Sequence, residues 1–405
     1  MKIVIIGASH AGTHAATLLR QQTQDNEIIL LSDEVSVPYQ RPPLSKSFLI
    51  GQQTEDQFQL KSTTAFEEMN IDLRCNCHVT KIDVNNKLLH TSTGKIHFDK
   101  LILATGGKPR TLQIDGIKKS DIHYLRDLQD AKSLQQRLSQ CKNICLIGGG
   151  YIGLETAASL RQLGKQVVVV EAADRILNRV VARQMSSFYQ AYHEQQGVNF
   201  LIEQHIIKAE KLGGKIHVLT NRGESFNTDL IIAGIGILPN IDLAEQAGLN
   251  CDNGIEVNRD CQTTAPDIYA IGDCANYPNS RYQARMRIES VQNATEQARI
   301  ATNHILGNPY KEQELPWFWS DQYQLKLKMA GLSQNHDEIV IRGSLQKAKF
   351  SCFYLLENRV IAVDCVNQAG EFMAAKILIN SKNKINKQLL SNVSISMKEI
   401  IILCQ

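Results

Sequence analysis

Residues Asn143–Glu171, NICLIGGGYIGLETAASLRQLGKQVVVVE, carry the pattern that decides the fold class. An apolar run leads into glycines, a helix-like segment follows, and a second apolar run ends at Glu171. The spacing Gly148-x-Gly150-x-x-Gly153 in this context is typical of a dinucleotide-binding unit with parallel strands. The helix after Gly150 would present free N–H groups and a partial positive charge to a pyrophosphate. The Glu171 carboxylate would bind ribose hydroxyls and repel a 2′-phosphate, which favours NADH over NADPH, although Arg175 could weaken that preference.

A second copy of this unit begins the chain. Lys2–Gly12, KIVIIGASHAG, has Gly7 and Gly12 in the same spacing, with Ser9 in place of the middle glycine. Serine adds little bulk, so a pyrophosphate can still approach the backbone. The next apolar run, EIILLSDE, ends on Asp33 and Glu34, and Asp33 lies about where a ribose-binding carboxylate belongs. Two such loops in one chain predict two bound nucleotides.

Composition sets the outer limits on function. The 405 residues are enough for two or three domains, and 43% hydrophobic with 21% charged residues is ordinary for a globular protein. A net charge of +3 is too small to indicate nucleic-acid binding, but it allows an acidic protein partner. No apolar run reaches the roughly 20 residues that span a bilayer, and the first residues read as a working strand, not a signal peptide. We expect no membrane association and a cytoplasmic location.

The ten cysteines give no metal-binding or redox motif. There is no C-x-x-C, so neither a zinc ribbon nor a thioredoxin-type pair is indicated, and we expect no metal site. Most of these thiols should be small core residues, and only Cys274 is expected close to a cofactor.

The stretch Val37–Phe48, VPYQRPPLSKSF, contains three prolines and no cysteine. Proline lacks a backbone donor, so the stretch cannot be a buried strand. It predicts a stiff loop that turns into a helix near Leu44 or Ser45. Elsewhere, TTAPDIYAIGDCA ends a short strand on Asp273, which could hold the ribityl chain of a flavin. LILATGGKPR (101–110) and DLIIAGIGILPN (229–240) read as crossing points between domains.

Eight motifs in this order resemble one family. They are GASHAG, PYQRPPLSK, LILATGGKPR, GGGYIGLE, GIGILPN, IYAIGD, ESVQNATEQA and PWFWSD. The chain resembles the two-dinucleotide flavoprotein reductases, and among them the ferredoxin and rubredoxin reductases, over about residues 1–330. The resemblance implies an α/β fold with two Rossmann-like domains, as in glutathione reductase, and a C-terminal α+β interface domain. It implies an FAD domain at 1–109 and 229–307, an NAD domain at 110–228 and the interface domain at 308–405.

The cysteine-free loop separates this chain from the disulfide reductases of the same fold. Those carry a reactive cysteine in the helix after the first ribose-binding strand. Here the flavin would pass electrons on directly. The resemblance places Lys46 beside the flavin ring, paired with Glu155, because a buried ammonium needs a partner. Trp319 would wall the ring, and Lys46, Glu155 and Trp319 are the predicted catalytic residues.

The remaining predicted site residues are cofactor contacts. Arg41 would touch the pyrophosphate or only pin its loop, and Arg126 would contact FAD or pair with Asp127 or Asp130. Val79 would be a flavin contact or simply part of the core. The predicted FAD contacts are Gly7, Ser9, Gly12, Asp33, Arg41, Lys46, Val79, Thr105, Gly106, Arg126, Asp273 and Val291. The predicted NAD contacts are Gly148, Gly150, Gly153, Glu171 and Gly236.

The implied function is electron transfer from NADH through FAD to an acidic iron–sulfur protein, a [2Fe–2S] ferredoxin or a rubredoxin. Lys326, Lys328 and the arginines of RYQARMR could offer it positive charge. Two alternatives stay open. One is a small-molecule reductase like monodehydroascorbate reductase, and the other is a redox-sensing flavoprotein like apoptosis-inducing factor.

Overall fold

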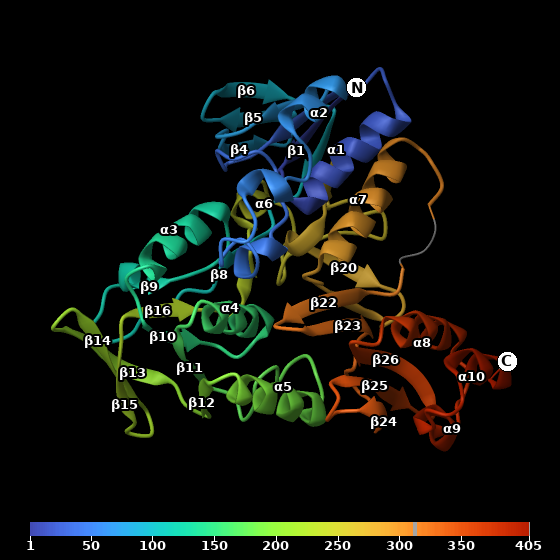
Figure 1. Cartoon of the computed structure of the whole chain (residues 1–405). Helices are drawn as coiled ribbons and strands as arrows, with labels where there is room; N and C mark the ends of the chain where they lie inside the picture. The colour runs from blue at the N-terminus through green and yellow to red at the C-terminus, as the bar shows by residue number, and fades with distance from the viewer. Residues whose placement is uncertain (311–313, 405) are drawn as a thin grey trace. The chain divides into compact units, whose positions relative to one another are not determined.

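The computed structural model describes residues 1–310 and 314–404 (Figure 1). The chain divides into two compact units. One consists of Met1–Arg41, Gln53–Lys108 and Ile237–Glu314, and the other of Pro42–Gln52, Pro109–Gly236 and Leu315–Gln405. The chain passes between them inside both segments that the sequence predicts as crossing points. Residues 311–313 and 405 of the expected interface domain lie outside the described residues.

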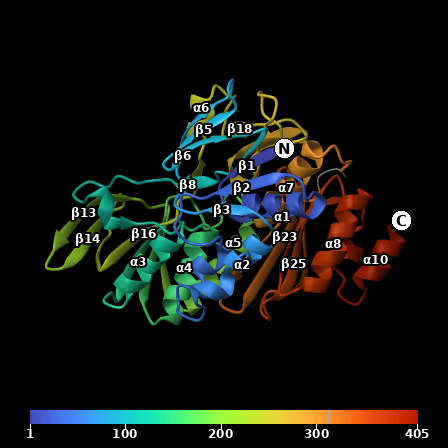
Figure 2. The ribbon, with the colours of Figure 1, turned by 90° about the horizontal axis from the view of Figure 1, so that it is seen from above.

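The first unit is built on a five-stranded parallel sheet in the order β19-β7-β1-β2-β3. Its strands are β1 (Lys2–Ile6), β2 (Glu27–Leu31), β3 (Asp72–Arg74), β7 (Lys100–Leu103) and β19 (Ile268–Ala270). The helices α1 (His10–Gln22) and α7 (Val291–Ile305) lie side by side against it (Figures 1 and 2). β1 and β2 are almost wholly apolar, as expected of parallel strands covered on both faces.

Smaller elements complete this unit. Two further three-stranded sheets are formed by β4 (Val79–Asp83), β5 (Leu88–Thr91) and β6 (Gly94–His97), and by β18 (Ile255–Glu256), β20 (Ala275–Asn279) and β21 (Ala284–Met286). The short helices are η2 (Glu55–Phe58), α2 (Thr63–Glu68), α6 (Asp242–Gln246) and η4 (Gly272–Cys274). The short strands β8 (Gly107–Pro109) and β17 (Ile237–Pro239) lie at two of the points where the chain changes units.

The second unit contains the other predicted parallel sheet, in the order β12-β11-β10-β16-β9. Its strands are β9 (Ile122–His123), β10 (Asn143–Ile147), β11 (Gln166–Glu171), β12 (Val198–Ile202) and β16 (Leu230–Ala233). Its helices are η1 (Pro42–Ser45), η3 (Lys119–Asp121), α3 (Leu128–Leu138), α4 (Tyr151–Gln162) and α5 (Arg183–Gln195), and an antiparallel extension adds β13 (Ile206–Leu212), β14 (Lys215–Thr220) and β15 (Ser225–Thr228).

The same unit ends in a five-stranded antiparallel sheet in the order β22-β23-β26-β25-β24. Its strands are β22 (Trp317–Gln322), β23 (Leu325–Gly331), β24 (Glu338–Ser344), β25 (Lys349–Leu356) and β26 (Arg359–Val366). One face packs on α8 (Ala369–Ser381), α9 (Lys387–Ser391) and α10 (Met397–Leu403), with α8 beside α10 in both ribbon views. The other face shares a core with α4 and α5, so β22 is held against α4.

The unit boundaries differ from the expected domain boundaries in several places. Residues 308–310 and 314 of the expected interface domain group with the first unit, and Pro109 of the expected FAD segment groups with the second. β16 pairs in parallel with β10, so residues 229–236 complete the second parallel sheet and are not part of the FAD segment. Residues 42–52 also group with the second unit, because their contacts are with α3 and α4. The expected NAD domain and the expected interface domain fall together in the second compact unit, and their division into two domains stays a prediction.

Within the described residues, no helix is both long and apolar enough to cross a membrane. No group of three or more His, Cys, Asp or Glu side chains in that part of the chain could hold a metal ion.

Candidate functional site

The first glycine loop joins β1 to α1 and has the shape of a dinucleotide cradle. Gly7 has φ +106°, and a Cβ there would lie 2.2 Å from the Ala104 carbonyl oxygen. A Cβ at Gly12 would lie 1.8 Å from the Gly7 carbonyl oxygen. A side chain at Gly7 would push the turn away from the backbone of Ala104, and one at Gly12 would push the helix that begins at His10 away from the turn. Ser9 is the N-cap of α1 and makes no side-chain capping bond within the described residues, which keeps the first turn open to an anion.

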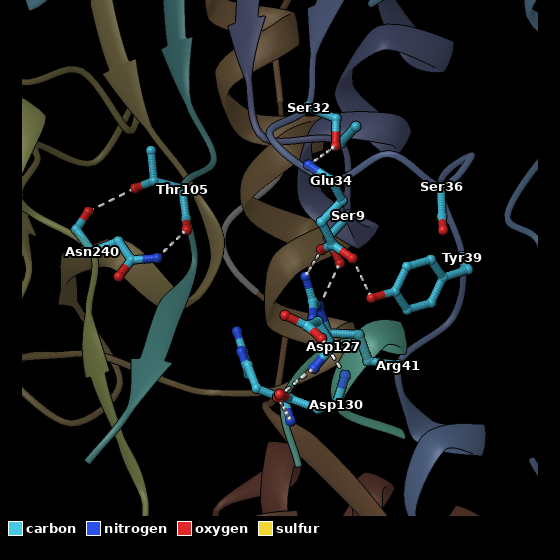
Figure 3. A network of polar contacts seen from close by, with 12 residues as sticks. Ser9, Ser32, Glu34, Ser36, Tyr39, Arg41, Thr105, Asp127, Asp130 and Asn240 are labelled. Atoms are coloured by element: carbon cyan, nitrogen blue, oxygen red, sulfur yellow. Dashed lines mark hydrogen bonds and ion pairs between the residues drawn. The ribbon is translucent and has the colours of Figure 1, made fainter. Parts of the chain in front are cut away.

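Arg41 is fastened to this loop (Figure 3). Its Nη2 lies 2.6 Å from Glu34 Oε1, and its Nε donates to Ser9 Oγ at 3.3 Å. Tyr39 donates its hydroxyl proton to the other Glu34 oxygen at 2.5 Å. Asp33, the predicted ribose ligand, is exposed beside this network. The sequence missed Glu34, although two adjacent acids at the strand end were the signal that could have found it.

The two crossing segments are clasped within the first unit (Figure 3). Thr105 Oγ1 donates to the Asn240 carbonyl at 2.7 Å, and Asn240 Nδ2 donates to the Thr105 carbonyl at 2.9 Å. Gly106 accepts a further bond from the Asn240 N–H at 2.9 Å and has φ +65°. Asn240 therefore holds the backbone of Thr105 and Gly106 in place, and the sequence did not single it out.

The other predicted FAD contacts of this unit lie at element ends. Val79 is buried at the start of β4, and Val291 is the first residue of α7, half-buried, after its N-cap Ser290. Asp273 is half-buried in η4. Cys274, expected near a cofactor, is fully buried next to it, with its Sγ 3.3 Å from the Ile271 carbonyl oxygen.

The second glycine loop, in the other unit, joins β10 to α4. Gly148 has φ +104°, and a Cβ on Gly153 would lie 2.1 Å from the Gly148 carbonyl oxygen. Gly150 is the N-cap of α4, and a Cβ there would meet nothing within 4 Å. The loop is thus tight where helix and strand meet and open where a pyrophosphate would approach. Gly236, the last residue of the Pro109–Gly236 segment of this unit, has φ +96°.

Glu171 is oriented by its own backbone surroundings. Its two carboxylate oxygens accept the Gly149 N–H at 2.6 Å and the Ala173 N–H at 2.7 Å. The Arg175 guanidinium makes its hydrogen bonds to other groups than the Glu171 carboxylate. It donates to the Val181 carbonyl at 2.9 Å, to the Asn178 carbonyl at 2.8 Å and to Ser186 Oγ at 2.6 Å. The nucleotide end of the loop therefore presents a fixed negative charge.

The predicted Lys46–Glu155 pair exists. Lys46 Nζ lies 2.7 Å from Glu155 Oε2, and the Glu155 side chain is only 2% exposed. Ser45 donates its hydroxyl proton to the same oxygen at 2.8 Å, and Ser320 donates to Oε1 at 2.7 Å. Three donors from two separate segments thus satisfy one buried carboxylate, as a buried charge requires.

Trp319 lies in β22, directly before Ser320. Its ring is half-buried and lies 5.6 Å from the ring of Trp317. Lys328 is its partner across the strand pair, while Lys326 is exposed. In the other unit, Arg285 donates to the Val257 carbonyl, and Arg287 lies 2.5 Å from Glu289. Both of these cations therefore already bind groups of their own unit.

Arg126 precedes α3. Its backbone N–H donates to Asp130 Oδ2 at 2.9 Å, and Asp127 caps the helix by accepting the Asp130 N–H at 2.8 Å. Asp127 and Asp130 thus form the capping box at the start of α3, and whether the Arg126 side chain contacts FAD or pairs with one of these aspartates stays a prediction.

Comparison with known proteins decides the family. The family described as pyridine nucleotide-disulphide oxidoreductase matches residues 1–298. The chain belongs to the pyridine nucleotide-disulphide oxidoreductases. A second family, described as reductase C-terminal, matches residues 317–401, which form the antiparallel sheet and the helices after it.

Relatives within this family share almost the whole chain. Putidaredoxin reductase from Pseudomonas putida is 40% identical, over 98% of this chain and 96% of its own. The ferredoxin reductase subunit of 5,5′-dehydrodivanillate O-demethylase from a Sphingobium strain is 37% identical, over 98% and 97%. A rubredoxin–NAD(+) reductase from Pseudomonas putida is 36% identical, over 91% and 96%.

A solved structure agrees with these matches. The covalent complex of putidaredoxin reductase with putidaredoxin contains a chain that matches with a TM-score of 0.95 and 39% identity, over 100% of this chain and 98% of that one. The fold class and the family inferred from the motifs are confirmed. As a member of the family, the chain is an oxidoreductase whose cofactors are FAD and NADH.

The residues present fit these cofactors. Two glycine cradles that a Cβ would fill stand before two helix N-termini, and each is followed by a carboxylate at the next strand end. The family description includes a disulphide, but the Pro38–Lys46 loop of this member contains no cysteine.

Proposed function

We propose that this oxidoreductase takes electrons from NADH and passes them through FAD to an iron–sulfur protein, a ferredoxin or a rubredoxin. The observation that carries the proposal is the Lys46–Glu155 ion pair on a loop without cysteine. A thiol relay needs sulfur at that loop, and an ammonium stands there instead. The names of the relatives, which are putidaredoxin, ferredoxin and rubredoxin reductases, support the same acceptor class.

Bound FAD would accept an electron pair from NADH and release electrons one at a time. Gly7, Ser9, Gly12 and Arg41 would hold its pyrophosphate end, with Asp273 on the ribityl chain. Gly148, Gly150 and Gly153 would bind the pyrophosphate of NADH.

Lys46 would act through its position and charge. Glu155 holds the ammonium in place and is itself satisfied by two hydroxyls, so the positive charge is fixed before any reaction. A preorganised charge favours the negative charge that a hydride brings. No nucleophile is needed for such a reaction.

The acceptor would be an acidic protein. The net charge of +3 and the cations Lys326 and Lys328 near Trp319 suit a negatively charged carrier. Because NADH is a metabolite of the cell interior, we place the reaction in the cytoplasm. Cell fractionation with an antibody would test that location.

The test compares electron acceptors. The purified FAD-loaded protein receives NADH, and cytochrome c reduction is followed with and without a [2Fe–2S] ferredoxin or a rubredoxin. We expect turnover to require the iron–sulfur protein. Rapid turnover of monodehydroascorbate without it would instead assign a small-molecule reductase, and a long-lived reduced protein with every acceptor would assign a redox sensor.

A further inference from the structure

Glu155 is the end point of a chain of buried hydrogen bonds that leads away from Lys46. Ser320 Oγ lies 2.7 Å from Glu155 Oε1, and Gln322 Nε2 lies 3.2 Å from Ser320 Oγ. Gln322 Oε1 lies 2.8 Å from His193 Nε2, and His193 Nδ1 lies 3.4 Å from the Tyr323 hydroxyl. Glu155, Ser320, Gln322 and His193 are each no more than 2% exposed.

The proton positions along this chain follow from one constraint. An ionised carboxylate only accepts, so Ser320 must spend its single proton on Glu155. Ser320 then accepts from the Gln322 amide nitrogen, which turns the amide oxygen towards His193. His193 must carry its proton on Nε2, and its Nδ1 accepts from Tyr323. Every donor in the chain therefore points towards Glu155.

His193 suits this arrangement because it is neutral. Its burial lowers its pKa to about 4, so the ring carries one proton at neutral pH. Hydrogen bonds aligned in one direction strengthen one another. These hydrogen bonds link His193 on α5, through two residues of β22, to Glu155 on α4. The geometry of the bonds therefore depends on how the C-terminal sheet packs on these two helices.

We propose that Ser320 and Gln322 are positioning residues for the Lys46–Glu155 pair, through which the C-terminal sheet completes the reactive centre. Ser320 fixes one carboxylate oxygen, and this leaves the other directed at Lys46. Gln322, held by His193, fixes Ser320 in turn. The inference rests on the proposed function for its kinetic consequence, but not for its structural one.

The structural test uses ¹⁵N-histidine NMR on the purified protein. We expect His193 to be neutral between pH 6 and 8 with its proton on Nε2. The Ser320→Ala and Glu155→Gln variants should both shift the His193 ring signals, because each interrupts or reverses the chain. Ser351→Ala is the matched control, since Ser351 is also a buried serine of this sheet that donates to a carboxylate, Glu371, at 2.5 Å. The inference would be overturned if the His193 ring signals were the same in Ser320→Ala and Glu155→Gln as in the wild type, or if the His193 proton were on Nδ1.

The kinetic test follows reduction of the bound FAD by NADH in stopped flow without oxygen. We expect Ser320→Ala to slow it about tenfold, in line with one lost hydrogen bond to a charged group. Gln322→Met, which keeps the Ser320 hydroxyl, should slow it about threefold and add nothing in the Ser320→Ala background. Ser351→Ala should leave the rate unchanged.

The outcomes separate the two proposals. Wild-type FAD that NADH cannot reduce contradicts the proposed function, and the NMR result still decides the inference. Variants that match the wild type while Lys46→Met is slowed contradict the inference alone. If Ser320→Ala does not fold, Gln322→Met decides, and an unchanged rate together with unchanged His193 signals would refute it.

Discussion

Glu171 stands at the end of β11 with both carboxylate oxygens held by backbone N–H groups, so its side chain is held in one orientation. Replacing it with Ala should lower the preference for NADH over NADPH about tenfold, because the repulsion of a 2′-phosphate is removed. The ratio of kcat/KM for the two nucleotides measures it. The exposed Arg222→Ala is the control, and a selectivity that survives Glu171→Ala would contradict the role.

Asp364 is a buried carboxyl whose contribution to the free energy of unfolding depends on pH. Its pKa is raised to about 7 by burial, although Tyr354 donates a hydrogen bond to it. An unfolded aspartate has a pKa near 3.9. Between these values the folded state holds a proton that the unfolded state has lost, so stability falls as pH rises from about 4 to 7.

The Asp364→Asn variant should therefore be more stable than the wild type at pH 8, by a few kcal/mol, and equal to it at pH 4. Urea unfolding at several pH values measures the difference. Parallel pH curves for the two proteins would show that Asp364 is ionised in the fold.

At the scale of elements, Arg342 anchors the last helices to the C-terminal sheet. Its guanidinium is 4% exposed, pairs with Glu371 at 2.8 Å, and donates to the carbonyls of Leu390, Asn392 and Ile395. Breaking such a buried pair costs roughly 3–5 kcal/mol. Arg342→Met should lower stability by about that amount and speed hydrogen exchange in α9 and α10.

The exposed ion pair between Lys387 of α9 and Glu338 of β24 is the control. Lys387→Ala should cost no more than about 1 kcal/mol, because water screens a surface pair. Equal losses for the two variants would contradict an anchoring role for Arg342.

Local patterns predict most elements of the C-terminal region. The alternating residues of KFSCFYLL and RVIAVDCV predict a hairpin, and Lys349–Leu356 and Arg359–Val366 form it through a turn at Glu357 and Asn358 with φ of +51° and +62°. The segment from Ser381 onward predicts only a terminal strand or short helix, and it forms two short helices. The apolar spacing of AGEFMAAKILIN predicts Phe372, Ala375, Ile377 and Ile379 on and around one helix face. Ile377 is wrong in this set, because at roughly 100° per residue it lies opposite Ala375 and Ile379, and it is 53% exposed.

For the whole molecule, the absence of sulfur chemistry can be tested directly. All ten cysteines are free, and six are buried. Burial raises the pKa of Cys145 to about 12 and of Cys251 to about 11, so few thiolates exist at neutral pH. N-ethylmaleimide should modify at most Cys75, Cys141, Cys251 and Cys404 in the native protein and leave the reduction of FAD by NADH intact.

Mass spectrometry counts the modified thiols, and the same reaction in urea should label all ten. Loss of FAD reduction after native alkylation would show that a thiol takes part, and would contradict direct transfer.

The sequence by itself determined the two glycine cradles, their acidic strand ends and the cysteine-free loop, because each depends on backbone sterics and residue chemistry over a few neighbouring positions. The Lys46–Glu155 pair could be named only because the motifs resembled a family. Tertiary structure alone decided that Ser320, Gln322 and His193 converge on Glu155. Glu155, His193 and the two residues of β22 are far apart in the chain, and only the packing of β22 against α4 and α5 brings their side chains within hydrogen-bond distance.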